Sequence, residues 1–161
     1  MQAQEMKQYM KMAMDEARLA QEKDEVPVGC VIVQNGNVIA RGHNLRETEK
    51  NALCHAELMA IHRASQVLGG WRLLGCTLYV TLEPCPMCAG AIVGSRIEKV
   101  VFGAYDPKAG ALGSLYNLAE GKLNHMPQVI GGVLQQECGE LLKDYFRQKR
   151  AKKRQREDAT R

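Results

Sequence analysis

Two short motifs constrain this chain more than any other feature of its sequence. His55-Ala56-Glu57 comes first, and Pro84-Cys85-Pro86-Met87-Cys88 follows it. One imidazole and two thiolates can supply three ligands to a tetrahedral zinc ion. Structural zinc sites are normally closed by four protein ligands, whereas three ligands leave a position for water, which is the catalytic arrangement. Because Glu57 adds a carboxylate two residues from the histidine, we expect a site that activates water and moves its proton.

Two alternatives for these motifs remain open from the residues alone. The Cys-x-x-Cys pair could be a thioredoxin-like redox pair, although such pairs do not usually accompany an upstream His-x-Glu. The zinc site could instead be structural and closed by a fourth ligand, for which Cys54, His43 and His62 are the candidates. Cys54 is disfavoured because it and His55 point in different directions on a helix.

Composition excludes several classes of protein. The chain has 161 residues, of which 45% are apolar and 25% charged, as expected for one globular domain. No apolar run approaches the ~20 residues of a membrane span, and the polar N-terminal segment does not resemble a signal peptide. Six cysteines without an export signal favour reduced thiols. We therefore expect a cytoplasmic protein with no membrane partner.

The positive charge lies at the C-terminal end. The formal net charge is +4, but the residues after Phe146 include eight basic and two acidic ones, which leaves −2 for the rest. Such a segment is typical of an arm that contacts phosphate groups, although a solvated helix end that aids solubility is the alternative. We therefore predict a zinc-binding domain over residues 1–150 and a basic tail over residues 151–161.

Periodicity and turn signals predict an α/β layered domain with a mixed sheet. Asn35-Gly36 predicts a hairpin turn between strands at 29–33 and 38–40. The other expected strands are at 76–81, 99–104 and 128–130. Helices are expected at 4–22, 54–68, 113–120, 133–154 and from Pro86 onward. Both motifs would then open helices, whose N–H groups and positive dipole ends stabilise thiolates.

His-x-Glu followed by Pro-Cys-x-x-Cys is the signature of zinc-dependent nucleoside and nucleobase deaminases, which this chain resembles. More specifically, residues 9–150 resemble the bacterial tRNA-specific adenosine deaminases of the zinc-dependent cytidine/deoxycytidylate deaminase superfamily. Asp106, Lys108 and Gly110, together with the aromatic and basic C-terminal end, narrow the resemblance to that family. The other matching stretches are Val26–Gly29, Gly42–Asn44, His55–Glu57, Trp71–Leu73, Thr81–Gly90 and Tyr145–Arg147.

The resemblance implies a three-layer cytidine-deaminase-like fold, in which helices flank a five-stranded mixed sheet, and a homodimer whose partner subunit borders the pocket. It also implies hydrolytic deamination of the wobble adenosine to inosine in the anticodon loop of an arginine tRNA. In this reading His55, Cys85 and Cys88 hold one zinc ion per subunit. Glu57 takes the proton of the attacking water, delivers it to the ring nitrogen and protonates the departing amine.

The resemblance further assigns eight residues to substrate binding. Val28 and Pro84 match walls of the pocket, and Asn44 matches a contact to the target nucleotide. The remaining five are Asp106 and Lys108 for the neighbouring anticodon nucleotides, Tyr145 and Phe146 for the aromatic edge of the pocket, and Arg147 for the start of the segment that meets RNA phosphates.

Two rival functions remain. A deaminase of free bases or nucleosides, such as guanine or cytosine, would share the zinc site but would not need a basic, aromatic-containing C-terminal helix. A noncatalytic, zinc-stabilised RNA-binding module would not need Glu57 beside an open zinc position. Inosine formation in an anticodon stem-loop, compared with deamination of free adenosine, cytosine and guanine, discriminates among the three.

Overall fold

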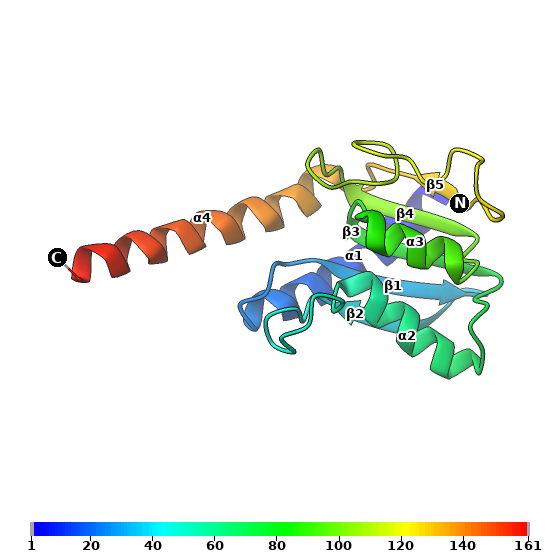
Figure 1. Cartoon of the computed structure of the whole chain (residues 1–161), viewed down its shortest axis with the longest axis horizontal. Helices are drawn as coiled ribbons and strands as arrows, with labels where there is room; N and C mark the ends of the chain where they lie inside the picture. Colours follow the sequence, from blue (N-terminus) through cyan, green and yellow to red (C-terminus); the bar gives the residue numbers. More distant parts are fainter. Residues whose placement is uncertain (1, 161) are drawn as a thin grey trace.

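The structure is a computed structural model that describes residues 2–160. Helix α1 comes first, a β-hairpin follows it, and helices and strands then alternate as far as β4, which is followed by β5 and the last helix (Figure 1). The elements are α1 (Gln2–Glu22), β1 (Gly29–Gln34), β2 (Asn37–His43), α2 (Ala56–Leu68), β3 (Cys76–Leu82), α3 (Pro86–Gly94), β4 (Lys99–Ala104), β5 (Gln128–Ile130) and α4 (Gln135–Ala159). None of the helices in this described part is both long and apolar enough to cross a membrane.

The five strands form one mixed sheet in the order β2-β1-β3-β4-β5. β1 is antiparallel to β2 and to β3, whereas β4 is parallel to β3 and to β5. This confirms the expected five-stranded mixed sheet. β3 and β4 are parallel, and Leu82 pairs with Ala104. The segments that follow these two strands therefore begin side by side, at the carboxyl ends of the strands.

Helices cover both faces of the sheet, so the domain has the three expected layers. Side chains alternate along β1, where Cys30 and Ile32 pack in the cluster that includes α2 and α3. Val31 and Val33 pack in the cluster that includes α1 and the beginning of α4. Figure 1 shows α2 and α3 on one side of the sheet and α1 on the other. Alternation with a period of two residues is what a sheet buried on both faces requires.

Close contacts of glycine with helix backbone fix the two layers. A Cβ atom on Gly42 of β2 would overlap the backbone of α2 at Ala56 and Ala60. A Cβ atom on Gly29 of β1 would likewise overlap the backbone of α1 at Ala13. Since both glycines are buried in the sheet, α1 and α2 approach it more closely than any larger residue allows.

The expected helix over residues 113–120 is wrong. This segment forms turns, with one isolated bridge between Leu112 and Asn117. Its amides bind elsewhere: those of Leu115 and Tyr116 donate to the carbonyl of Gly110, at 2.9 and 3.1 Å. The amide of Ser114 donates to a side chain outside the segment, at 3.0 Å. These three amides are therefore not part of an i to i−4 helical ladder.

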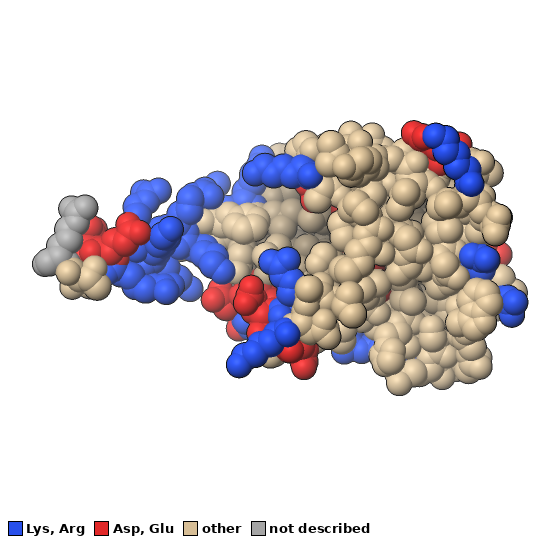
Figure 2. Space-filling view, viewed as in Figure 1, with Lys and Arg blue, Asp and Glu red and all other residues tan. Residues whose placement is uncertain are grey.

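The C-terminal helix is longer than expected. α4 continues without a break through residue 150, so the expected division at that position is not a change in secondary structure. Its second half projects away from the three-layer body (Figure 1). Figure 2 shows lysine and arginine gathered over this projecting part, whereas most of the body surface in that view is uncharged. The basic end of the chain is thus an exposed helix.

Gly29→Ala should lower the free energy of unfolding by about 3 kcal/mol, because the added methyl group overlaps helix backbone that cannot move alone. Gly139→Ala is the matched control, because Gly139 lies inside α4 with no atom within 4 Å of an added Cβ. That substitution should raise stability by about 0.5–1 kcal/mol. Denaturant unfolding of the two variants measures both values, and equal stabilities would contradict the close approach of α1.

Candidate metal centre and active-site pocket

Three side chains from the two motifs meet at one point. Nδ1 of His55 lies 3.7 Å from Sγ of Cys85 and 3.5 Å from Sγ of Cys88. In tetrahedral zinc sites the metal–sulfur and metal–nitrogen distances are about 2.3 and 2.0–2.1 Å, which places such ligand atoms roughly 3.6 Å apart. The three donors therefore fit zinc without rearrangement. Within residues 2–160, no other His, Cys, Asp or Glu side chain joins this group.

The ends of two helices position these donors, as the sequence predicts. His55 is the N-cap of α2 and Cys85 is the N-cap of α3, and both have extended backbone conformations. Neither side chain caps its own helix, so both remain free to bind a metal. Pro86 occupies the first turn of α3, where its missing N–H costs nothing. Hydrogen bonding with Cys88 and with His55 lowers the pKa of the Cys85 thiol to about 4, despite burial.

Asn44 performs the capping that His55 does not. Its Oδ1 accepts a hydrogen bond from the amide of Ala56, at 2.9 Å. Its own amide donates to the carbonyl of Val28, at 3.2 Å. Asn44 thus connects the beginning of β1 to the first turn of α2, which carries His55 and Glu57. The sequence associates Asn44 with substrate, and the structure adds this positioning contact.

Glu57 is buried beside the three donors, and burial raises the pKa of its carboxyl group to about 7. It is not one of the clustered ligands. The candidates for a fourth ligand lie elsewhere: Cys54 is not part of the donor group, both ring nitrogens of His43 are hydrogen-bonded, to Glu16 and Lys23, and His62 is exposed on α2. Within the described chain the site is therefore an open, three-ligand one, which disfavours the closed structural zinc site.

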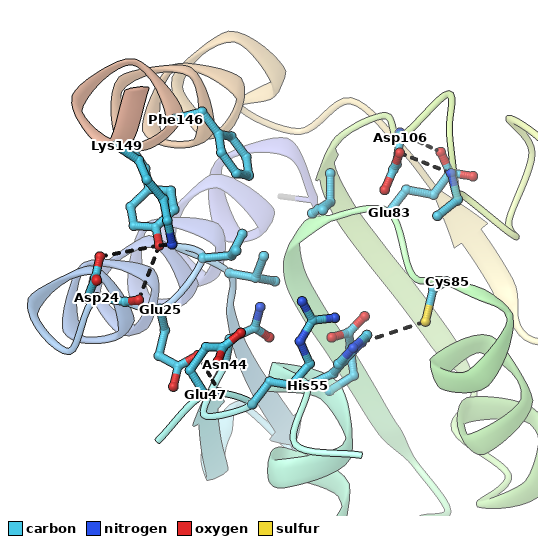
Figure 3. A pocket seen from close by; sticks show the side chains of 17 residues that line it. Asp24, Glu25, Asn44, Glu47, His55, Glu83, Cys85, Asp106, Phe146 and Lys149 are labelled. Atoms are coloured by element: carbon cyan, nitrogen blue, oxygen red, sulfur yellow. Dashed lines mark hydrogen bonds between the residues drawn. The ribbon is translucent and has the colours of Figure 1, made fainter. Parts of the chain in front are cut away.

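A cavity of about 340 Å³ lies over the metal centre. This is within the size range of small-molecule sites, which is roughly 300–1,000 Å³. Figure 3 shows Asn44, His55 and Glu47 on one side, Glu83, Asp106 and Cys85 on another, and Phe146 and Lys149 above them. The residues that the sequence assigns to the site and that line this cavity are Val28, Asn44, His55, Glu57, Cys85, Asp106, Tyr145 and Phe146.

The other sequence-assigned residues lie outside the cavity wall. Cys88 is buried behind it, among the metal donors. Pro84 is buried too, and its carbonyl accepts a hydrogen bond from the amide of Ala111, at 2.8 Å. Lys108 and Arg147 line a separate cavity. The structure therefore groups the assigned residues into a pocket and a neighbouring surface.

The two aromatic residues of α4 differ in their surroundings. Tyr145 is buried, and its hydroxyl donates to the carbonyl of Asp24 at 3.1 Å and accepts from Nζ of Lys149 at 3.2 Å. Phe146 is 42% exposed. Tyr145 thus anchors α4 to the segment after α1, whereas Phe146 offers a ring at the mouth of the pocket.

A basic groove lies on the other side of Phe146. We call it the α4 groove; it has a volume of about 590 Å³ and is lined by Lys108, Leu142, Lys143, Phe146, Arg147 and Arg150. Lys143, Arg147 and Arg150 are spaced i, i+4 and i+7, so they share one face of α4. Lys108 approaches this face from the loop after β4. Phe146 borders both the groove and the pocket over the metal centre.

Sequence reasoning gave no role to Glu25 and Glu83, which are buried at the pocket wall with 2% exposure each. Glu25 accepts hydrogen bonds from the amides of Glu47 and Thr48 and from the Thr48 hydroxyl, at 3.1, 2.6 and 2.6 Å. Burial alone would raise the pKa of each carboxyl group, but the hydrogen bonds outweigh it and hold the pKa below its usual value. For Glu83 the sequence did hold one signal, which is its position directly after β3 and before Pro84.

The donor set predicts about one bound zinc ion per chain. Cys88→Ala removes one of three ligands, so the zinc-to-protein ratio after dialysis should fall towards zero. His62→Ala is the matched control, because His62 is an exposed histidine of α2 outside the donor group. Elemental analysis of both variants measures the ratio, and an unchanged ratio in Cys88→Ala would contradict the assigned ligands.

Comparison with known proteins places this geometry in a family. The cytidine and deoxycytidylate deaminase zinc-binding region matches residues 3–104. The chain is 59% identical over 147 residues to a tRNA-specific adenosine deaminase of Bacillus subtilis (strain 168), covering 91% of each. It is also similar, with 44% identity and a TM-score of 0.81, to a structure from work on A-to-I editing by tRNA:A34 deaminases at the wobble position of transfer RNA, over 84% of this chain and 99% of that one.

A more distant similarity is to guanine deaminase from Bacillus subtilis, with 30% identity and a TM-score of 0.59 over 73% of this chain and 85% of that one. The structural and sequence similarities agree with the open His55, Cys85 and Cys88 site, for which zinc is the cofactor. The chain belongs to the cytidine and deoxycytidylate deaminase family and, within it, to the tRNA-specific adenosine deaminases.

Proposed function

We propose that this protein hydrolytically deaminates the wobble adenosine of a tRNA anticodon to inosine, with arginine tRNA as its substrate. The observation that carries the proposal is the continuity of the site across Phe146. On one side of this ring lies the pocket over the metal donors, and on the other lies the basic α4 groove. A base can enter the pocket while its neighbouring phosphates meet the groove.

The chemistry divides between zinc and Glu57. When bound by Nδ1 of His55 and Sγ of Cys85 and Cys88, zinc lowers the pKa of water to roughly 7, so that hydroxide is available at neutral pH. The Glu57 carboxylate takes the proton of the attacking water and delivers it to the ring nitrogen next to C6. Glu57 then takes the second proton from the hydroxyl group now on C6 and passes it to the amino group, so that C6 keeps the water oxygen as a carbonyl and ammonia leaves. Such proton transfer typically contributes about 10²–10⁴-fold to the rate.

The pocket wall selects an unpaired base. An anticodon loop is single-stranded, so turning one base outward costs far less than opening a duplex. Phe146 offers an exposed ring for stacking, which is worth roughly 1–3 kcal/mol per base. Asn44 and Val28 line another part of the wall. Deamination of a free base such as guanine is the alternative function, and it leaves the α4 groove without a role.

We also infer that the protein is a cytoplasmic homodimer in which the partner borders the pocket. Gly90 and Gly94 lie one helical turn apart on the exposed face of α3, with no atom within 4 Å of an added Cβ. Such small residues allow another chain to approach α3 next to Cys85. Sedimentation equilibrium should give twice the chain mass of 17.9 kDa, and a monomer mass would contradict this inference.

The function is tested by inosine formation in an arginine tRNA anticodon stem-loop, read by mass spectrometry of its nucleosides. We expect turnover of the stem-loop and none of free adenosine, cytosine or guanine. Glu57→Ala should keep its zinc but lose turnover by at least about 10²-fold, because the proton carrier is gone while the ligands remain. Faster turnover of a free base than of the stem-loop would favour the alternative function, and normal activity of Glu57→Ala would exclude the proposed proton transfer.

The α4 groove predicts a salt-dependent affinity for the stem-loop. On single strands log K falls with log[salt] with a slope of about −0.7 for each phosphate neutralised, so Arg147→Ala and Arg150→Ala should each reduce the slope by about 0.7. Arg72→Ala is the matched control. Arg72 is exposed in the segment before β3, whereas the pocket lies beyond the other end of that strand, where Cys85 follows it. Fluorescence anisotropy titrations at several salt concentrations measure the slopes. If the slope of log K against log[salt] were the same in all three variants, the α4 groove would not contribute to RNA binding.

A further inference from the structure

Glu83 makes an unusual set of contacts for a buried carboxylate. Its Oε1 accepts from the amide of Asp106 at 3.0 Å and from the hydroxyl of Ser114. Its Oε2 accepts from the amides of Leu112 and Ser114, at 3.1 and 3.0 Å. All four donors belong to residues 106–114, which we call the recognition loop because it carries Asp106 and Lys108. The carboxylate therefore lies inside the loop and binds both of its ends.

The recognition loop is wound around Glu83 at close range. A Cβ atom on Gly110 would overlap the Glu83 carboxyl group, so the loop backbone passes directly over it. The neighbouring carbonyl of Pro84 accepts from the amide of Ala111, at 2.8 Å. The amide of Glu83 donates to the carbonyl of Ala104 at 2.9 Å, which extends the pairing of β3 with β4. The segment that leads to Cys85 is therefore attached to the loop at several points.

This arrangement determines where Lys108 lies. Oδ1 of Asp106 accepts from the amides of Lys108 and Ala109, at 3.0 and 3.1 Å, so the tip of the loop is a turn closed by Asp106. The amide of Asp106 is itself held by Glu83. Lys108 is exposed at this tip and reaches the α4 groove. Glu83 and Cys85 are two residues apart, so one short segment carries both the support of the loop and a metal ligand.

We propose that Glu83 is a positioning residue of this site: it holds the recognition loop against the strand end that carries Cys85, and so fixes the distance between the metal centre and the Lys108 cation. The last step rests on the proposed function, since it assigns Lys108 to an RNA phosphate. Glu83 then sets the affinity for the nucleotides beside the target adenosine, and not the chemistry at C6.

Glu25 provides an internal comparison. It is a buried carboxylate that lines the same pocket from the opposite wall, and it binds the amides of Glu47 and Thr48 in the loop before α2. The hydrogen bonds of Glu25 within residues 2–160 go to Glu47 and Thr48, and none goes to the recognition loop. A substitution at Glu25 therefore creates an equivalent defect in the opposite wall and leaves the support of Lys108 intact.

Hydrogen exchange tests the clamp without any substrate. Glu83→Gln keeps the shape of the side chain but replaces an acceptor oxygen with a donor, so the amides of Asp106, Leu112 and Ser114 should exchange about 10–100-fold faster. The exchange rates of the Glu47 and Thr48 amides should not change. In Glu25→Gln the amides of Glu47 and Thr48 should exchange faster, and those of the recognition loop should not change. Should Glu83→Gln fail to fold, Ser114→Ala removes the hydroxyl donor alone and should accelerate exchange in the recognition loop by a smaller factor. Unchanged exchange in the recognition loop would overturn the proposal.

A double-mutant cycle tests the positioning of Lys108. Lys108→Ala in the wild-type background should raise KM for the stem-loop about tenfold with little change in kcat, because one charge-assisted contact is lost. In the Glu83→Gln background the same substitution should change KM by less than about twofold, since Lys108 is no longer held in place. In the Glu25→Gln background it should again cost about tenfold.

The outcomes separate this proposal from the proposed function. A tenfold effect of Lys108→Ala in the Glu83→Gln background, or no effect in the wild-type background, overturns the positioning role. A wild-type protein that forms no inosine in the stem-loop overturns the proposed function and, with it, the assignment of Lys108 to RNA. Acceleration of exchange confined to the recognition loop would then still support Glu83 as the clamp of that loop.

Discussion

The site depends on how closely α2 lies against the sheet. Gly42 leaves no room between β2 and the backbone of α2 at Ala56 and Ala60, so the first turn of α2 has one possible position. Through the parallel pair of β3 and β4, the sheet also fixes where α3 begins, next to that turn. His55 and Cys85 therefore face each other from two helix N-termini. Side-chain flexibility contributes little to this geometry, because the ligands are attached to elements packed against a shared core.

The use of N-cap positions for metal ligands has a structural consequence. An N-cap side chain normally accepts a hydrogen bond from the first turn, but a ligand that turned back to its own helix could not bind zinc. The structure separates the two tasks, because Asn44 supplies the acceptor for α2 while His55 faces the thiols. Asn44 therefore contributes to the pocket wall and to the stability of the helix that carries Glu57. A polar residue at the pocket need not be there for the substrate alone.

The sequence predicted the layers, the sheet and the metal donors because each depends on local patterns. Alternation in β1, the Asn35-Gly36 turn and the two motifs are all legible within a few residues. The segment after residue 112 was not predictable in the same way: it has the composition of a short helix, but its amides donate to Glu83 and to the carbonyl of Gly110. The two aromatic residues of α4 also look alike in sequence, and only the contact of Tyr145 with Asp24 distinguishes the anchor from the exposed ring of Phe146.

Two carboxylates suit the support of these loops better than apolar packing does. The backbone amides of a surface loop that turn inward need acceptors beneath the surface. An ionised carboxylate has two oxygens and can accept several amide bonds at once, which compensates the cost of burying its charge. Glu25 and Glu83 both do this, one in each wall, and neither forms an ion pair among residues 2–160. Lys108, at the tip of one of these loops, likewise forms no ion pair among residues 2–160, so its charge is not used to neutralise the buried acids.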